Sequence, residues 1–87
     1  MMNNPIAVVR KDLNLSPQQF AMFLKVSTTL VYAVEKGIVK NPKSIIQAMA
    51  RKYLVADEEE LRKQYFTWWE EKTEKERARV EKFLASK

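Results

Sequence analysis

Cysteine and histidine are both missing from the 87-residue sequence. Their absence excludes disulfides, thiolate nucleophiles and zinc sites built on these residues, and it removes the side chain that most often acts as a general base. The adjacent acidic residues at 58–60 and 70–71 have no companion base. We therefore expect no enzymatic activity, no metal or other cofactor, and no small-molecule substrate.

Long hydrophobic runs are missing as well. The longest unbroken apolar stretches, Phe20–Leu24 and Leu30–Val34, are five residues each, whereas a membrane-spanning helix needs about 20. The first four residues carry no basic segment of the kind that begins a targeting sequence. We expect a cytoplasmic protein without a membrane partner.

Glycine occurs only once, at Gly37, and no Ser/Gly-rich tract or internal repeat divides the chain. The residues that favour helices, among them Ala, Leu, Lys, Glu, Arg and Met, are plentiful. A chain of this length forms one small domain with one core. The composition therefore predicts an all-α fold.

Proline occurs three times, and each proline follows a residue that caps helices well. Proline suits the first helical position, and the preceding Asn or Ser can accept a bond from a free backbone N–H. The three pairs are Asn4-Pro5, Ser16-Pro17 and Asn41-Pro42. Ser27 and Asp57 are two further caps, and Gly37 is a natural helix stop. The predicted helices cover residues 5–13, 17–24, 28–36, 42–54 and 58–72.

The positive charge is concentrated in the first two thirds of the chain. Residues 1–56 carry eight basic and two acidic side chains, a net charge of +6, whereas residues 57–87 carry eight basic and nine acidic, a net charge of −1. A polyanionic partner would meet the first segment. The alternative is that scattered lysines only solvate a surface.

The segment LSPQQFAMFLKVSTTLVYAVEKG carries a family resemblance. It has a small residue, Ala21, where two helices can cross closely, Leu24 and Val26 flanking a corner, and Val31 and Val34 facing a core. Over about residues 6 to 61 the chain resembles the helix-turn-helix of Cro and phage-repressor-like (XRE-type) DNA-binding proteins. The resemblance implies a five- to six-helix lambda-repressor-like domain, with a DNA-binding core at residues 1–56 and a C-terminal helical extension at 57–87.

The resemblance implies a sequence-specific transcription regulator that binds operator DNA through the helix at residues 28–36. By position, the residues that contact bases are Thr28, Thr29, Tyr32 and Ala33. Their hydroxyl, methyl and ring groups favour modest, A·T-leaning selectivity, because none grips guanine as arginine does. The expected phosphate contacts are Ser16, Gln18, Lys25, Lys36, Lys40, Asn41, Lys43 and Ser44. The alternative is that the threonines are ordinary first-turn residues and Tyr32 a half-buried ring.

Three features depart from the family pattern. Pro17 stands where the family often has a glutamine that touches the DNA backbone. Lys25 replaces the usual corner glycine, where positive φ is expected and a side chain costs about 1 to 2 kcal/mol. Met22 and Phe23 occupy positions that are commonly charged, so we expect the last third of the chain to cover them.

The last third allows two arrangements. Thr73 with Glu76 forms a capping box that would start a sixth helix at about 74–85, folding back on the fifth. Alternatively, one long helix runs through and carries a short heptad seam. We favour the break. In either case Trp68 is expected in the core, and Phe66, Trp69 and Phe83 are the candidate residues of a homodimer or partner interface. The alternative is that Trp68 and Trp69 both only complete the core of the monomer.

A protein-interaction module on the same scaffold is the second functional hypothesis. Such a module, for example an antirepressor or another phage or mobile-element regulator, would grip its partner through Phe23, Phe66 and Trp69. Helix-turn-helix units occur in domains that bind no DNA, so the motif does not decide between the two.

Overall fold

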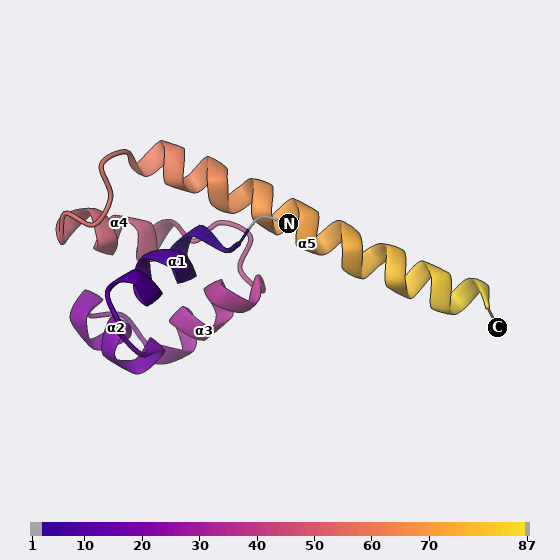
Figure 1. Ribbon diagram of the computed structural model, residues 1–87, viewed down its shortest axis with the longest axis horizontal. Coiled ribbons are helices and arrows are strands. Elements are labelled where there is room, and N and C mark those ends of the chain that lie inside the picture. Colours follow the sequence, from indigo (N-terminus) through magenta and orange to yellow (C-terminus); the bar gives the residue numbers. More distant parts are fainter. Residues whose placement is uncertain (1–2, 87) are drawn as a thin grey trace.

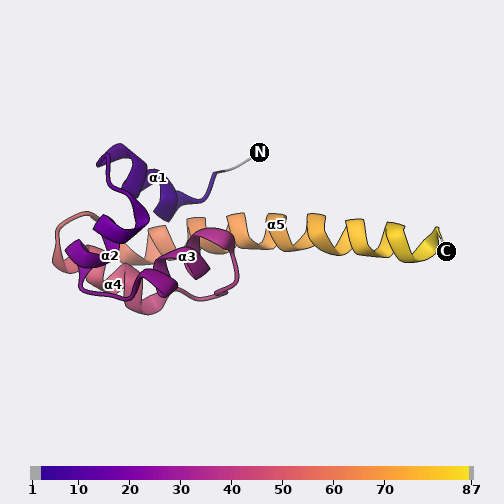
Figure 2. The same ribbon diagram turned by 90° about the horizontal axis from the view of Figure 1, so that it is seen from below.

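The computed structural model describes residues 3–86, which form five helices and no strand, so the predicted all-α class is confirmed. The helices are α1 (Pro5–Asp12), α2 (Pro17–Leu24), α3 (Thr28–Lys36), α4 (Lys43–Arg51) and α5 (Glu58–Ala85). The first four helices form a globular body, and α5 crosses this body and projects far beyond it (Figure 1). The second view shows the same projection (Figure 2).

Most of the predicted helix starts are confirmed. The side chain of Asn4 accepts bonds from the backbone of α1, and Ser16 caps α2 through a reciprocal capping box with Gln19. Ser27 caps α3 by accepting from the N–H of Leu30 at 3.0 Å. Gly37 ends α3 in the left-handed region, with φ 80°, a conformation that glycine adopts without a steric cost.

The predicted bounds of the helix at 42–54 are wrong at both ends. The helix begins at Lys43, with Pro42 in the cap position and no side-chain cap bond, so Asn41 does not cap it. Pro42 has φ −82° and ψ 54°, outside the helical region, and is buried. The helix stops at Arg51, and Tyr53 then takes a positive φ of 57°, which an α-helix cannot contain.

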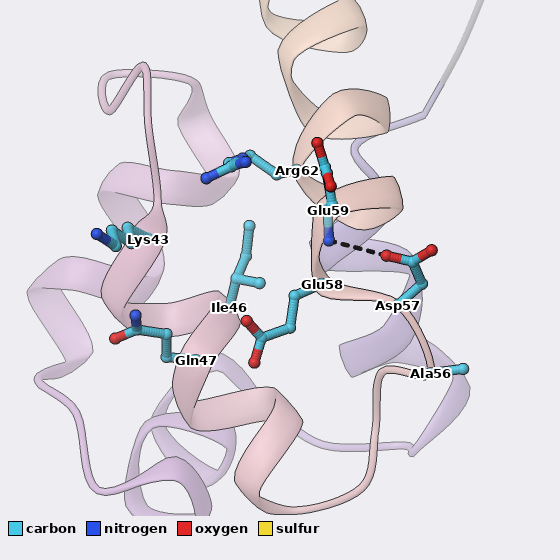
Figure 3. Close-up of a pocket in the computed structure, with 8 residues that line it drawn as sticks. All are labelled: Lys43, Ile46, Gln47, Ala56, Asp57, Glu58, Glu59 and Arg62. Carbon is cyan, nitrogen blue, oxygen red and sulfur yellow. Dashed lines mark hydrogen bonds between the residues drawn. The ribbon is translucent and has the colours of Figure 1, made fainter.

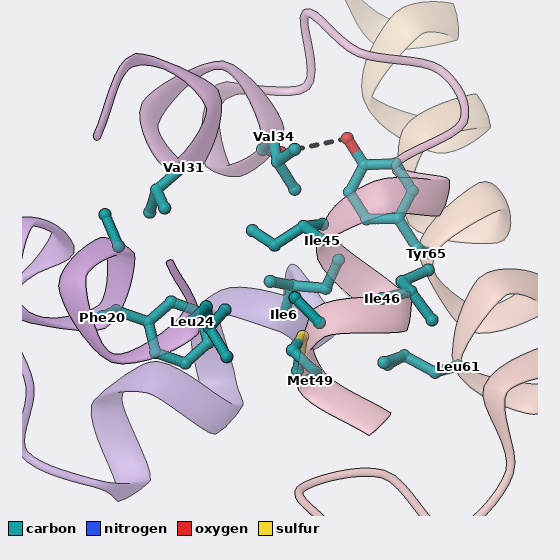
Figure 4. Close-up of a cluster of buried hydrophobic side chains, with 12 residues drawn as sticks. Ile6, Phe20, Leu24, Val31, Val34, Ile45, Ile46, Met49, Leu61 and Tyr65 are labelled. Carbon is teal, nitrogen blue, oxygen red and sulfur yellow. Dashed lines mark hydrogen bonds between the residues drawn. The ribbon is translucent and has the colours of Figure 1, made fainter. Parts of the chain in front are cut away.

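One hydrophobic cluster joins all five helices (Figure 4). The helices α2 and α3 pack against each other around the buried Ala21, and α4 contributes a broad apolar face. The last helix adds Leu61 and Tyr65, so the first part of α5 is a component of the core. The buried side chains that form the centre are Ile6, Phe20, Leu24, Val31, Val34, Ile45, Ile46, Met49, Leu61 and Tyr65.

The predicted break near Thr73 is wrong, because α5 is one continuous helix of 28 residues. No glycine or proline interrupts it, and the residues around 73 are strong helix formers. The ammonium of Lys72 lies 2.6 Å from the carboxylate of Glu76, one turn later, which supports the helix across the expected break. Glu76 is therefore engaged along the helix, and no hairpin forms.

Tyr65 is the buried aromatic residue that fastens α5 to the body. Its hydroxyl lies 2.6 Å from the carbonyl oxygen of Val39 and 3.0 Å from that of Val34, and its one hydrogen is shared between them. Burial disfavours the phenolate and raises the pKa of Tyr65 to about 12.

Tyr65→Phe removes this hydroxyl and leaves two carbonyl oxygens without its hydrogen. We expect the free energy of unfolding to fall by about 1 to 3 kcal/mol in urea titrations at neutral pH. The exposed Tyr53 provides the matched control, and Tyr53→Phe should change the free energy of unfolding by less than about 0.5 kcal/mol.

The same pair of variants tests the raised pKa. An unfolded tyrosine ionises near 10.0, whereas Tyr65 in the fold ionises near 12. Between these values the unfolded chain loses this proton first, so the wild type should lose stability as the pH rises from 10 to 12. Tyr65→Phe should lack this part of the alkaline loss, whereas Tyr53→Phe should retain it. If the free energy of unfolding changes equally with pH in the wild type and in Tyr65→Phe between pH 10 and 12, the raised pKa does not belong to Tyr65.

Candidate nucleic-acid interface

The corner between α2 and α3 is built by a left-handed residue. Lys25 has φ 59° and ψ 43°, so the positive φ expected at this corner is present. After the corner, the N–H of Val26 donates to the carbonyl oxygen of Ala21 at 3.0 Å, and Ser27 caps α3. These local bonds fix the direction in which α3 leaves the corner.

The C-terminal end of α3 is held by three side chains from two other parts of the chain, the start of α1 and the helix α5. The carbonyl oxygen of Val34 accepts from the side chain of Asn4 at 3.1 Å and lies within bonding distance of the Tyr65 hydroxyl. The indole N–H of Trp69 donates to the carbonyl oxygen of Gly37 at 2.9 Å. These bonds satisfy carbonyl groups that a helix end leaves unpaired. The C-terminal end of α3 is therefore fixed to the body, and this fixes the direction of its N-terminal end.

Glycine is required at position 37 for a second reason besides its positive φ, which is its close approach to α5. A Cβ atom on Gly37 would lie 2.9 Å from a carbon of the Lys72 side chain and 3.0 Å from the ring of Trp68. The backbone of Gly37 therefore packs directly under α5. Trp68 is partly buried against the core, as its predicted core role requires.

The outward face of α3 carries Thr29, Tyr32 and Lys36, which are three and four residues apart and therefore share one side of the helix. All three are exposed, and the Tyr32 ring is 42% accessible. The ammonium of Lys36 lies 6.0 Å from the centre of that ring. Thr28 and Ala33, the other two predicted base contacts, are partly buried at the edges of this face.

The acidic residue of α3 is turned away from this face. Glu35 receives two hydrogen bonds from Arg10 of α1, at 2.7 Å from Nε and 2.9 Å from Nη2, and both side chains are mostly buried. Arg10 also donates to the carbonyl oxygen of Leu15 at 2.7 Å. The hydrogen bond that Arg10 donates to Glu35 raises the pKa of Arg10. The sequence analysis missed this pair, although Glu35 is the single acidic residue of α3.

The eight predicted phosphate contacts are all exposed, but they lie in different surroundings. Lys25 lies at the corner beside the start of α3, and Lys43 and Ser44 begin α4. Lys40 instead extends toward α5, with its ammonium 5.8 Å from the Phe66 ring and 5.4 Å from the Trp69 ring. Asn41 is not a helix cap, because α4 begins at Lys43 with Pro42 in the cap position. The remaining members of the set are Ser16, Gln18 and Lys36.

The expectation that the last third covers Met22 and Phe23 is wrong. Met22 is 79% exposed and Phe23 is 43% exposed. The reason is the direction of α5, which packs against α1 and α4 instead of crossing α2. The ammonium of Lys52 lies 5.2 Å from the Phe23 ring and partly shields it.

A pocket lies between α4 and the start of α5 (Figure 3). Asp57 lies in its wall, but its carboxylate caps α5 by accepting from the N–H of Glu59 at 3.0 Å. The other lining residues are Lys43, Ile46, Gln47, Ala56, Glu58, Glu59 and Arg62. Within residues 3–86, no group of three or more acidic, His or Cys side chains is placed to hold a metal ion. Over the same residues, no helix has the length and apolar character needed to span a bilayer.

Comparison of the chain with protein-family models, with curated proteins and with solved structures gave no match. The interpretation of the outward face of α3 therefore depends on its own geometry and charge.

Replacing the corner lysine should stabilise the fold. Lys25→Gly removes the steric cost of a side chain at φ 59°, and we expect the free energy of unfolding to rise by up to about 1 kcal/mol in urea titrations. Lys25→Ala removes the same charge but keeps a Cβ atom, so it should give no such gain. A Lys25→Gly variant that is less stable than Lys25→Ala would contradict the strained corner.

Proposed function

We propose that this protein is a sequence-specific DNA-binding transcription regulator of the phage-repressor or Cro type. It acts in the cytoplasm by occupying an operator with α3 in the major groove. The observation that carries the proposal is the outward face of α3, which presents Thr29, Tyr32 and Lys36 while Arg10 holds Glu35 away from it. Such a face offers groups that contact base edges and no carboxylate that repels phosphates.

The chemistry of the exposed groups decides which residues contact bases and which contact phosphates. The hydroxyl of Thr29 can bond a base edge, and its methyl group and the Tyr32 ring can contact the 5-methyl of thymine. Lys25 at the corner, Lys36 on the outward face of α3 and Lys43 at the start of α4 neutralise phosphates. The affinity of the complex comes mainly from these cations, and its selectivity is modest and leans toward A·T pairs.

A protein-interaction module is the second candidate function. The exposure of Met22 and Phe23 on α2 favours it, because large apolar side chains on a surface often mark a protein contact. Phe66 is also exposed and belongs to the same hypothesis. The Trp69 indole is already bonded to Gly37, which leaves less of it for a partner.

Salt dependence separates the two functions. Binding to a fluorescent duplex, titrated at several salt concentrations, should weaken steeply with salt. Lys43→Ala should reduce the slope of log affinity against log salt by roughly one, because one phosphate contact is lost. Lys82→Ala on the projecting part of α5 removes the same charge and should leave the slope unchanged. Absence of duplex binding at low salt would reject the DNA function, and co-purification of a protein partner would then support the second candidate.

Selectivity is tested by competition between duplexes taken from a random pool by the wild type. Tyr32→Ala should narrow the preference between selected and scrambled duplexes by about 1 kcal/mol or more, because a base contact is lost. Tyr53→Ala is the matched control, since Tyr53 is exposed on the connection between α4 and α5. Equal loss of selectivity in both variants would contradict the role of α3.

A further inference from the structure

The projecting part of α5 carries an apolar seam that the body does not cover. Val80, Phe83 and Leu84 are 55%, 59% and 60% exposed. The C-terminal part of α5, to which they belong, lies beyond the body in both ribbon views (Figures 1 and 2). The seam continues toward the body with alternating spacings of three and four residues, which is the repeat of helix pairs that pack side by side. Its members are Phe66, Trp69, Thr73, Glu76, Val80 and Phe83, of which Trp69 is partly buried against the core and donates to the carbonyl oxygen of Gly37.

The seam matches a second copy of itself when the two helices run in opposite directions. Phe66 then meets Phe83 of the second copy, and Trp69 meets Val80. The two polar members, Thr73 and Glu76, meet each other at the centre. The same contacts occur twice because the pair has two-fold symmetry, so each copy supplies both sides of every pairing.

Charges beside the seam favour this direction. In the antiparallel pair, Glu70 of one copy faces Arg77 of the other, and this attraction occurs twice. The remaining flanking pair, Lys72 with Arg79, is a repulsion that also occurs twice, so attraction and repulsion balance in the antiparallel pair. A parallel pair would place Lys72 against Arg77 twice and would bring the two Glu76 carboxylates together at the centre. The charge pattern therefore opposes the parallel pair.

The body has a groove in which the end of the second helix can pack. An open groove runs along Phe66, between the connection that follows α3 and the first turns of α5. Its lining residues are Lys40, Asn41, Arg62, Lys63, Phe66 and Thr67. The antiparallel register brings Phe83 of the second copy to this groove. We propose that the protein forms an antiparallel homodimer through α5, with the projecting half of each helix packed along Phe66 and Trp69 of the other.

The proposed dimer also determines where the two globular bodies lie relative to the helix pair. On a helical wheel, the side of α5 that carries Leu61, Tyr65 and Trp68 lies roughly a quarter turn from the seam, so both bodies lie on the same side of the helix pair. The midpoint of the register lies between residues 74 and 75, which separates the two Tyr65 residues by about 28 Å along the helix axis. The N-terminal end of α3 lies farther from the tip of α5 than its C-terminal end (Figure 1).

This geometry sets the spacing of the two base-reading ends. Along the helix axis they are farther apart than the two Tyr65 residues, and an operator with half-sites one DNA turn apart requires a separation of roughly 34 Å. The spacing rests on the proposed function, whereas the interface itself does not.

Sedimentation equilibrium over a range of concentrations tests the interface without DNA. The wild type should change from monomer to dimer as concentration rises. Arg77→Glu should weaken the dimer about 3- to 10-fold, because two attractions become repulsions. Adding Glu70→Arg should restore the affinity. Lys82→Glu makes the same charge change outside the seam and should have little effect, and circular dichroism of each variant checks that α5 remains helical.

Three outcomes would overturn the proposal. A wild type that is monomeric at every concentration removes the interface. If Glu70→Arg does not restore the dimer affinity of the Arg77→Glu variant, the antiparallel register is rejected, since only the antiparallel pair brings these residues together. A tighter dimer in Arg77→Glu indicates the parallel pair, in which Lys72 gains an acidic neighbour. A dimer with this mutational pattern but no duplex binding would reject the proposed function and leave the interface intact.

Discussion

The anchoring of the C-terminal end of α3 is the constraint on which the rest of the structure depends. Asn4 from α1 and Tyr65 and Trp69 from α5 supply hydrogen bonds to carbonyl groups between residues 34 and 39. A helix end leaves such groups unpaired, and in a buried place they need partners. Because three distant segments meet there, the other end of α3 is held in a fixed direction at the surface.

Local chemistry made much of the helical framework predictable. Ser16, Ser27 and Gly37 mark helix ends through interactions with neighbouring residues, and these positions agree with the structure. The exact bounds of α2 and α3 followed from them. Asn41 failed as a cap because Pro42 packs into the core outside the helical region, and the tertiary contact overrides the local preference.

The candidate site was predictable in its position but not in its surroundings. Thr29 and Tyr32 are exposed as expected, yet the pairing of Arg10 with Glu35 joins residues 25 positions apart and leaves no local pattern. The exposure of Met22 depends on where the last helix packs. A capping box at Thr73 is only a local option, and the helix formers on both sides of it decide for the uninterrupted helix.

The central claim is that the outward face of α3 meets duplex DNA. Its most direct test is an NMR titration of the labelled protein with a duplex that the protein selects from a random pool. The account predicts that the largest shifts fall on Thr29, Tyr32 and Lys36 and on the neighbouring Lys25 and Lys43, with the tip of α5 unchanged. Shifts confined to α5 or to Met22 and Phe23, with α3 unaffected, would contradict it.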